Sequence, residues 1–307
     1  MGGSEEGLTT LEASAAEAAA PGTRRRRRPR LATPALLGLP LGWLVVFLLV
    51  PIAIVALYSV DVFSLFPGPH SFALGGWYRL FHQGYMSLFW KSAKMSLIVS
   101  AIVVVTAYPL AYFLALSGTR RKYVLLLLLI APFMTSYLLR VLAWKVILGD
   151  QGVVNSFLGS VGLHPLSFLL YSRFAVMLVL GYVWLPFVAL PIFVTLETID
   201  HRLLEAASDL YASRWKAFVR VTLPLSMPGV VAAFLFVFIP TVGEFVTPSL
   251  VGGTSGYMYG NQIVDFFQQG FPDWETGAAL ALFLIAVISV LTFVFVRFLR
   301  LGEAQAA

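Results

Sequence analysis

The chain has 307 residues, of which 59% are hydrophobic and only 12% are charged, whereas soluble domains average about 45–50% and about 25%. With a mean hydropathy of +0.85, this composition excludes an ordinary soluble protein and predicts an integral membrane protein. The absence of cysteine excludes disulfides, thiol catalysis and cysteine-ligated metals. The net charge of +6, which would favour nucleic-acid binding in a soluble protein, is here interpreted as a topology signal beside the membrane.

Residues 1–34 differ from everything that follows. An acidic, alanine-rich stretch leads into a run of arginines at residues 24–28, with Arg30 close behind. Such a segment cannot bury enough surface to fold alone, and we predict a disordered tail. The apolar run at 35–60 is longer than the core of a cleaved signal peptide, which has about 7–15 residues, so we expect an uncleaved first span.

Six apolar segments reach the length of about 20 residues that a helix needs to cross a bilayer. The predicted fold is therefore an all-α membrane protein with a six-span domain over 35–302. The predicted spans are about 36–60, 92–117, 123–148, 174–198, 228–251 and 277–300. Prolines inside them are expected to kink the helices, as in a bundle that encloses a pathway; they are Pro51, Pro109, Pro132, Pro186, Pro191 and Pro240.

Basic residues are distributed unevenly between the loops. Of the 21 lysines and arginines, 15 lie in the tail, in the loops after the second and fourth spans and at the C-terminal end. The positive-inside rule then places both termini in the cytoplasm. The opposite side carries only Arg79, Lys91, Lys94 and Arg173. Its aromatic residues are interpreted as an interfacial belt, with cation binding as the alternative; they include Trp77, Tyr78, Tyr257, Tyr259 and Trp274.

The last cytoplasmic loop, 201–224, is the least membrane-like long stretch of the apolar part of the chain. The first of two predicted short helices places its small and apolar residues on one face: Leu203, Ala206, Ala207 and Leu210. Ser213 is the expected N-cap of the second helix. We expect Leu223-Pro224 to end that helix and Pro228-Gly229 to open the fifth span. Two interpretations remain: amphipathic helices on the membrane surface, or a docking knob for a cytoplasmic partner.

This loop resembles the signature of permease subunits of ABC importers. The matching residues are Glu205-Ala206-Ala207, followed at the family's spacing by Val221 and Leu223-Pro224. The resemblance implies a coupling helix that fits into a cleft of a separate ATPase subunit, with these candidate residues: Glu205, Ala206, Ala207, Asp209, Leu210, Tyr211, Leu223 and Pro224. The family has glycine where this chain has Tyr211, and glycine adopts a positive φ more readily than tyrosine.

A narrower resemblance extends over most of 90–300. Segments 136–158 and 223–253, and the outer segment through Phe266, Phe267, Asp273 and Trp274, are similar to the first permease of spermidine/putrescine-type importers. The resemblance implies a type I importer fold in a bacterial inner membrane and transport by alternating access. It implies as partners a second, related permease in a heterodimer, two ATPase subunits and a soluble substrate-binding protein. ATP and Mg would bind the ATPase, and this chain would bind no cofactor.

Other function classes lack the residues that they need. The sequence has no Gly-x-x-x-x-Gly-Lys-Ser/Thr loop, no His-Glu-x-x-His helix and no Gly-x-Ser-x-Gly elbow. The four histidines are scattered without metal-ligand spacing, so we predict a transporter subunit and not an enzyme. The alternatives are an importer of another small solute (another amine, an amino-acid derivative or a phosphonate), an ATP-independent secondary transporter and a membrane scaffold.

Two ionisable residues are predicted deep inside spans, where charges usually face protein or water. At 1.5 Å per residue, Glu244 lies about 22 Å along the fifth span and Arg140 about 26 Å along the third. Both should therefore reach a similar depth in the outer half of the membrane. Either they form a buried ion pair that holds an outer gate, or Glu244 meets the ammonium group of a substrate. The further candidates for this pathway are Phe245, Phe238 and Trp144.

Overall fold

The computed structural model describes residues 32–63, 71–116, 121–268 and 273–306. All regular structure in these ranges is helical, as expected. The predicted disordered tail, 1–34, lies almost wholly outside the described residues. The described part has five helices long and apolar enough to cross a membrane, or six if one bent pair of helices counts as a single span.

The chain divides into two compact units, Met1–Ile52 and Ala53–Ala307. The first unit contains most of α2 (Ala32–Ser59), which is apolar along its length and includes Pro40 and Pro51. Every side chain from 41 to 50 is exposed. An apolar helix with no buried face over ten residues is suited to contact lipid or another membrane protein.

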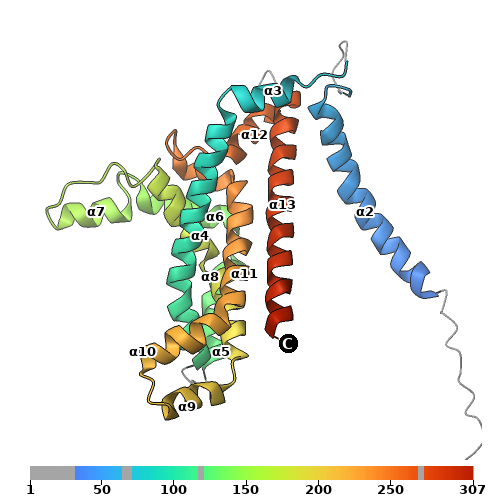
Figure 1. Cartoon of the computed structure of the whole chain (residues 1–307). Coiled ribbons are helices and arrows are strands. Elements are labelled where there is room, and N and C mark those ends of the chain that lie inside the picture. Colours follow the sequence, from blue (N-terminus) through green and yellow to red (C-terminus); the bar gives the residue numbers. More distant parts are fainter. Residues whose placement is uncertain (1–31, 64–70, 117–120, 269–272, 307) are drawn as a thin grey trace, which may run out of the picture. The chain divides into compact units, whose positions relative to one another are not determined.

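Three long helices build the main core of the second unit (Figure 1). They are α4 (Tyr85–Leu116), α8 (Arg173–Glu197) and α11 (Leu223–Val242). Small residues let them approach closely. A Cβ atom on Gly229 of α11 would lie 2.2 Å from Thr195 Oγ1 on α8, so only glycine fits at this crossing. Ser92, Ser96 and Ser100 on α4 are fully buried.

A second cluster lies at the end of the bundle where α4 begins. It joins α3 (Gly75–His82), α12 (Tyr259–Gln268) and α13 (Trp274–Ala306) around Leu80, Phe89 and Tyr259. Tyr259 is fully buried, its amide donates to Ser92 Oγ at 2.7 Å, and its hydroxyl donates to the Leu280 carbonyl at 3.1 Å. The prediction that Tyr259 belongs to an interfacial aromatic belt is therefore wrong.

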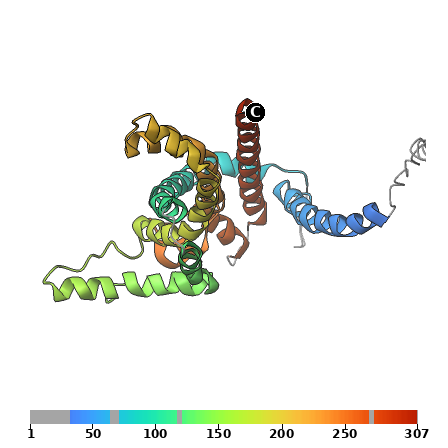
Figure 2. The ribbon, with the colours of Figure 1, turned by 90° about the horizontal axis from the view of Figure 1, so that it is seen from below.

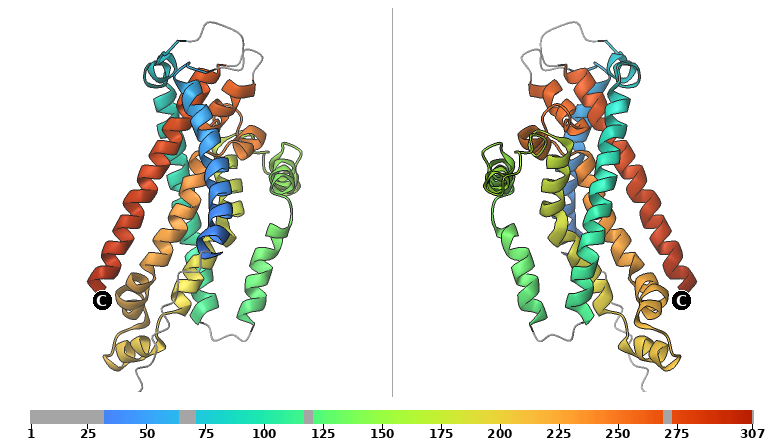
Figure 3. Two further views of the ribbon diagram at one scale, coloured as in Figure 1. Left: turned by 90° about the vertical axis from the view of Figure 1, so that its right-hand side faces the viewer. Right: turned by 90° about the vertical axis from the view of Figure 1, so that its left-hand side faces the viewer.

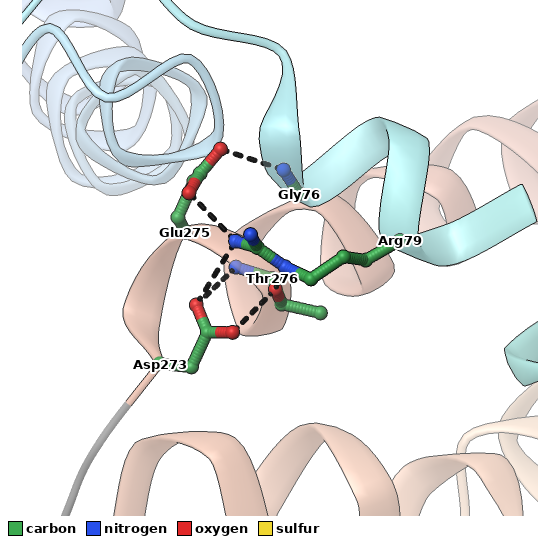
Figure 4. A network of polar contacts seen from close by, with 5 residues as sticks. All are labelled: Gly76, Arg79, Asp273, Glu275 and Thr276. Atoms are coloured by element: carbon green, nitrogen blue, oxygen red, sulfur yellow. Dashed lines mark hydrogen bonds and ion pairs between the residues drawn. The ribbon is translucent and has the colours of Figure 1, made fainter. Parts of the chain in front are cut away.

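A polar clamp fastens α3 to the first turn of α13 (Figure 4). The Arg79 guanidinium pairs with Glu275 at 2.6 Å and with Asp273 at 3.4 Å, and its Nε donates to Thr276 Oγ1 at 2.5 Å. The second Glu275 oxygen accepts from the Gly76 amide at 2.6 Å. Each charged group has a partner, so the clamp holds these helix ends in register.

The predicted span 123–148 is not one continuous helix, and the kink expected at Pro132 is a sharp break. The chain instead forms α5 (Lys122–Ile130), a 3₁₀ turn η1 (Ala131–Met134) and α6 (Tyr137–Leu148), with a bend of 86° between Lys122–Met134 and Tyr137–Ser160. Pro132 and the extended backbone at Thr135 break the helix. Figure 2 shows α6 in line with α7 (Val153–Ser160), extending away from the three-helix core.

The fifth span also differs from its prediction at both ends. Leu223-Pro224 does not stop the preceding helix: α10 (Arg214–Ala217), a π-helical turn η2 (Phe218–Thr222) and α11 are continuous. The Leu223 amide donates to the Phe218 carbonyl, and this wider turn relieves the clash that proline makes in an α-helix. At the other end α11 stops at Val242, and a second π turn, η3 (Pro248–Gly252), follows.

Candidate functional site

One end of the second unit, residues 200–217 and called the tip below, contains α9 (His201–Asp209) and α10. Within this unit α9 lies beyond the lower ends of α4 and α11 (Figures 1 and 3). The Asp200 carboxylate caps α9 by accepting from the Arg202 amide at 2.9 Å. The Ser213 hydroxyl accepts from the Lys216 amide at 3.4 Å, which confirms the predicted N-cap.

Tyr211 adopts the conformation for which glycine is usual. Its φ is +57°. The Tyr211 amide donates to the Ser208 carbonyl at 2.9 Å, and the Ala212 amide donates to the Ala207 carbonyl at 3.0 Å. These two bonds form the Schellman motif that ends many helices, with Tyr211 at the left-handed position. The turn between α9 and α10 is therefore kept despite the missing glycine.

The tip exposes both charge and large apolar side chains. Leu210 is 82% exposed, Tyr211 97% and Trp215 72%. The acidic candidates Glu205 and Asp209 are exposed too, as is Ala206, while Ala207 is half-buried. Large exposed apolar side chains beside charges are typical of contact surfaces, so the tip is a candidate for one.

An aromatic chain links this tip to the core. Trp215 stacks on Phe218 with ring centroids 5.4 Å apart, and Phe218 meets Tyr112 and Tyr108 of α4 edge to face at 5.5 and 5.8 Å. The Tyr108 hydroxyl shares a 2.8 Å hydrogen bond with Ser226 of α11. Leu223, half-buried, and Pro224, exposed, lie in the same continuous helix. A displacement of α10 would therefore act on α4 and α11 together.

The end of α11 turns around Glu244. Its Oε1 accepts from the Val246 amide at 2.9 Å and from the Thr247 amide at 3.2 Å, so the carboxylate caps the next helical turn. Asn261 of α12 donates to the Phe245 carbonyl at 2.9 Å and to Ser249 Oγ at 2.7 Å. The Glu244 carboxylate, predicted within the fifth span, thus stabilises the bend that follows α11.

Arg140 lies on α6, beyond the break after α5. It is 9% exposed, and its guanidinium carbon is 4.1 Å from the centroid of the Phe133 ring. Its Nε has no hydrogen-bond partner, and none of the ion pairs among the described residues joins it to Glu244. The direct ion pair, one of the two alternatives for these residues, does not form among the described residues, because both helices break before them. The Tyr137 hydroxyl shares a 2.6 Å hydrogen bond with Thr247 Oγ1.

The other candidate aromatics are dispersed. Phe245 is half-exposed at the bend, Phe238 stacks on Phe234 at 5.8 Å, and Trp144 meets Tyr182 edge to face at 5.4 Å. A more continuous aromatic surface was not predicted. It consists of Phe133, Trp184, Phe187 and Phe236, with neighbouring ring centroids 4.0 to 6.1 Å apart. Their helical spacing, with Trp184 and Phe187 three residues apart, was the available signal.

No group of three or more His, Cys, Asp or Glu side chains in the described part of the chain could hold a metal ion.

The hydrogen bonds that hold the bend, from Tyr137 to Thr247 and from Asn261 to Ser249, were not predicted from the sequence. They join residues 110 and 12 positions apart in the chain, and no local pattern announces the first of them.

Comparisons with known proteins identify a family model and several relatives that match this chain. The model of the binding-protein-dependent transport system inner membrane component matches residues 107–303. The spermidine/putrescine transport system permease protein PotB of Escherichia coli (strain K12) is 35% identical over 85% of this chain and 95% of its own. PotB of Haemophilus influenzae is 34% identical over 83% and 90%.

Solved structures agree on the fold. A chain of a bacterial alginate ABC transporter, crystallised in complex with an alginate pentasaccharide-bound periplasmic protein, superposes with a TM-score of 0.61. It is 18% identical, and the match covers 84% of this chain and 90% of that one. Together the matches confirm the resemblance seen in segments 136–158 and 223–253.

Proposed function

The chain belongs to the family of binding-protein-dependent transport system inner membrane components, and we propose that the solute it carries is a polyamine. As a member of this family it is a permease subunit of an ABC importer and not an enzyme, and it is a multi-pass protein of a bacterial inner membrane. The observation that carries the substrate class is the 34–35% identity to spermidine/putrescine permeases over nearly their whole length.

The proposed assembly has both termini and the tip in the cytoplasm. A second, related permease completes the translocation pathway as a heterodimer, and two ATPase subunits bind ATP and Mg. A soluble receptor delivers substrate from outside; the periplasmic protein in the complex of the alginate transporter supports a partner of that kind. This chain needs no cofactor of its own in this scheme.

The tip is the proposed contact with the ATPase. Exposed Glu205 and Asp209 offer carboxylates to a basic partner, and the small Ala206 and Ala207 allow close approach. The protruding apolar side chains of Leu210, Tyr211 and Trp215 support docking over a solvated surface helix. When the ATPase subunits close, the tip moves, and the rings of Trp215, Phe218 and Tyr108 pass that movement to α4 and α11.

The outer bend is the proposed gate. Glu244 positions the turn after α11. Arg140, on the neighbouring α6, lies over the ring of Phe133. The half-buried rings of Phe133, Trp184 and Phe187 and the exposed ring of Phe236 offer π faces to an ammonium group that passes between the two permeases. In this arrangement Phe245, Phe238 and Trp144 border the pathway, and Glu244 shapes it more than it binds the substrate.

The test is substrate-stimulated ATPase activity of the reconstituted importer across a panel of solutes. We expect putrescine or spermidine with the cognate receptor to stimulate hydrolysis several-fold, and an amino-acid derivative or a phosphonate to leave it at the basal rate. Stimulation by one of the other solutes and not by any polyamine would keep the permease assignment and overturn the substrate class.

A further inference from the structure

Three of the four basic residues expected on the outer side line a single cavity. Lys91 and Lys94 of α4 and Arg173 of α8 surround a space of about 730 Å³, together with Met95, Ile98 and Met177. The fourth basic residue, Arg79, lies elsewhere and is paired with Asp273 and Glu275. Arg79 is thus neutralised by carboxylates of the protein. The other three cations lie around one cavity, and among the described residues no carboxylate pairs with them.

The cavity has a charged end and an apolar wall. On α4, Lys91, Met95 and Ile98 follow one another at helical spacing on one face, and on α8 Arg173 and Met177 do the same. Both helices enter the bundle at this end, so the cations lie at the same level and the apolar residues lie deeper. Ile98 is about 10 Å further along α4 than Lys91.

The cations are held in place but are not neutralised. The Lys91 ammonium donates to the Tyr257 carbonyl at 3.0 Å, and Arg173 Nε donates to the Ser255 carbonyl at 2.9 Å. Lys94 is exposed. Among the described residues, no carboxylate forms an ion pair with any of the three. Lys91 and Arg173 repel each other electrostatically, so an anion between them would be favoured.

We propose that this cavity binds the phosphodiester headgroup of an anionic phospholipid, with an acyl chain against Met95, Ile98 and Met177. Basic pockets between membrane helices on the matrix or cytoplasmic side bind such headgroups, and the same charge complementarity applies to an anionic lipid of the outer leaflet. The 58% exposed Trp90 is typical of the membrane interface. Free phosphate shares the headgroup's chemistry but would leave the apolar wall without a partner. A polyamine is repelled by three cations, so this site is separate from the proposed substrate pathway.

The test uses the complete importer in nanodiscs of phosphatidylcholine with a minor fraction of phosphatidylglycerol, with retained lipid counted by native mass spectrometry. We expect preferential retention of phosphatidylglycerol, reduced about five-fold for each cation removed. Lys94→Gln is the first variant because Lys94 is exposed and has no ion-pair partner within the described ranges, so its loss should not disturb folding. Lys91→Gln and Arg173→Gln are then added. Arg297→Gln, which removes an exposed cation of α13 that does not line the cavity, is the control for general surface attraction and should lower retention less than Lys94→Gln does.

Two further arms separate the sources of the anion. Ile98→Trp fills the apolar wall without changing charge and should lower retention of long-chain phosphatidylglycerol. Inorganic phosphate at millimolar concentration should not displace the lipid. Displacement by phosphate, together with wild-type retention in Ile98→Trp, would overturn the lipid assignment in favour of a simple anion site. Equal retention by the parent, Lys94→Gln and the triple variant would overturn the site altogether.

Discussion

At the scale of single residues, Tyr211 is the clearest departure from what local chemistry favours. A left-handed conformation costs a non-glycine residue about 1–2 kcal/mol, and the almost fully exposed ring recovers nothing by packing within this chain. We expect Tyr211→Gly to stabilise the end of α9 by about 1 kcal/mol. Hydrogen exchange of the Ala212 amide, which donates to the Ala207 carbonyl, should slow several-fold in the assembled importer.

Tyr211→Ala is the control for that change, because it removes the ring but keeps a Cβ at positive φ. Unchanged or faster exchange in Tyr211→Gly would contradict the strain argument. If both variants lose ATPase stimulation equally, the ring itself contacts the ATPase, and the strain is retained for that contact.

Glu244 can be tested as a positioning residue. Its carboxylate accepts two backbone N–H groups, and an amide oxygen can do the same, so Glu244→Gln should keep the bend and most substrate-stimulated ATPase activity. Glu244→Ala removes the acceptor, and loss of a cap costs about 1 kcal/mol. Its melting temperature in detergent should therefore fall below that of Glu244→Gln. Loss of stimulation in Glu244→Gln with normal assembly and basal ATPase would instead assign the negative charge to substrate binding.

At the scale of elements, the continuous α10–η2–α11 helix is the proposed lever. Phe218 joins it to α4 through two edge-to-face contacts, each of which contributes about 0.5–1.5 kcal/mol. We expect Phe218→Ala to preserve assembly and basal ATPase activity but to lower stimulation by substrate and receptor at least several-fold. Phe113→Ala is the matched control, because Phe113 lies next to Tyr112 with its ring exposed. Full stimulation in Phe218→Ala would rule out the aromatic link as the coupling route.

The elements also show where sequence reasoning succeeds and where it fails. Hydropathy located the spans at 92–117 and 174–198 within a few residues, apart from the earlier start of α4, because long apolar runs leave the chain few alternatives. Pro132 predicted a kink in the third span, but hydropathy could not show that the helix breaks there, since the residues around Pro132 are as apolar as their neighbours. Pro224 is expected to end the helix because proline clashes with the preceding turn of an α-helix. The π turn η2 relieves that clash, and the helix continues.

The candidate site shows a similar division. The motif around Glu205 and the Ser213 cap are local signals, and local structure follows from them. An ion pair with Arg140 was one of two alternatives for Glu244, and both placed it within a helix that continues to 251, whereas Gly243 and the contacts of Asn261 end that helix. The clamp of Arg79 joins residues 194 to 197 positions apart. Such partners depend on the packing of α3 against α13, which periodicity alone does not specify.

At the scale of the whole molecule, function depends on which side of the membrane the tip faces. The absence of native cysteine makes single-cysteine labelling a clean test. Gln83 and Ser208 are both exposed, at the end of α3 and on α9. We expect a membrane-impermeant maleimide to label Gln83→Cys in spheroplasts whose inner membrane is intact. Ser208→Cys should react only after the membrane is permeabilised, because the positive-inside rule places the tip in the cytoplasm.

Each cysteine variant must first support transport, so that the labelled molecules are known to be folded and assembled. An excess of ATPase subunits should then protect Ser208→Cys, but not Gln83→Cys, in permeabilised membranes. Labelling of Ser208→Cys from outside would invert the orientation and remove the tip as the ATPase contact. It would leave the family assignment in place but require a different surface for coupling, since the tip and the nucleotide would then lie on opposite sides of the bilayer.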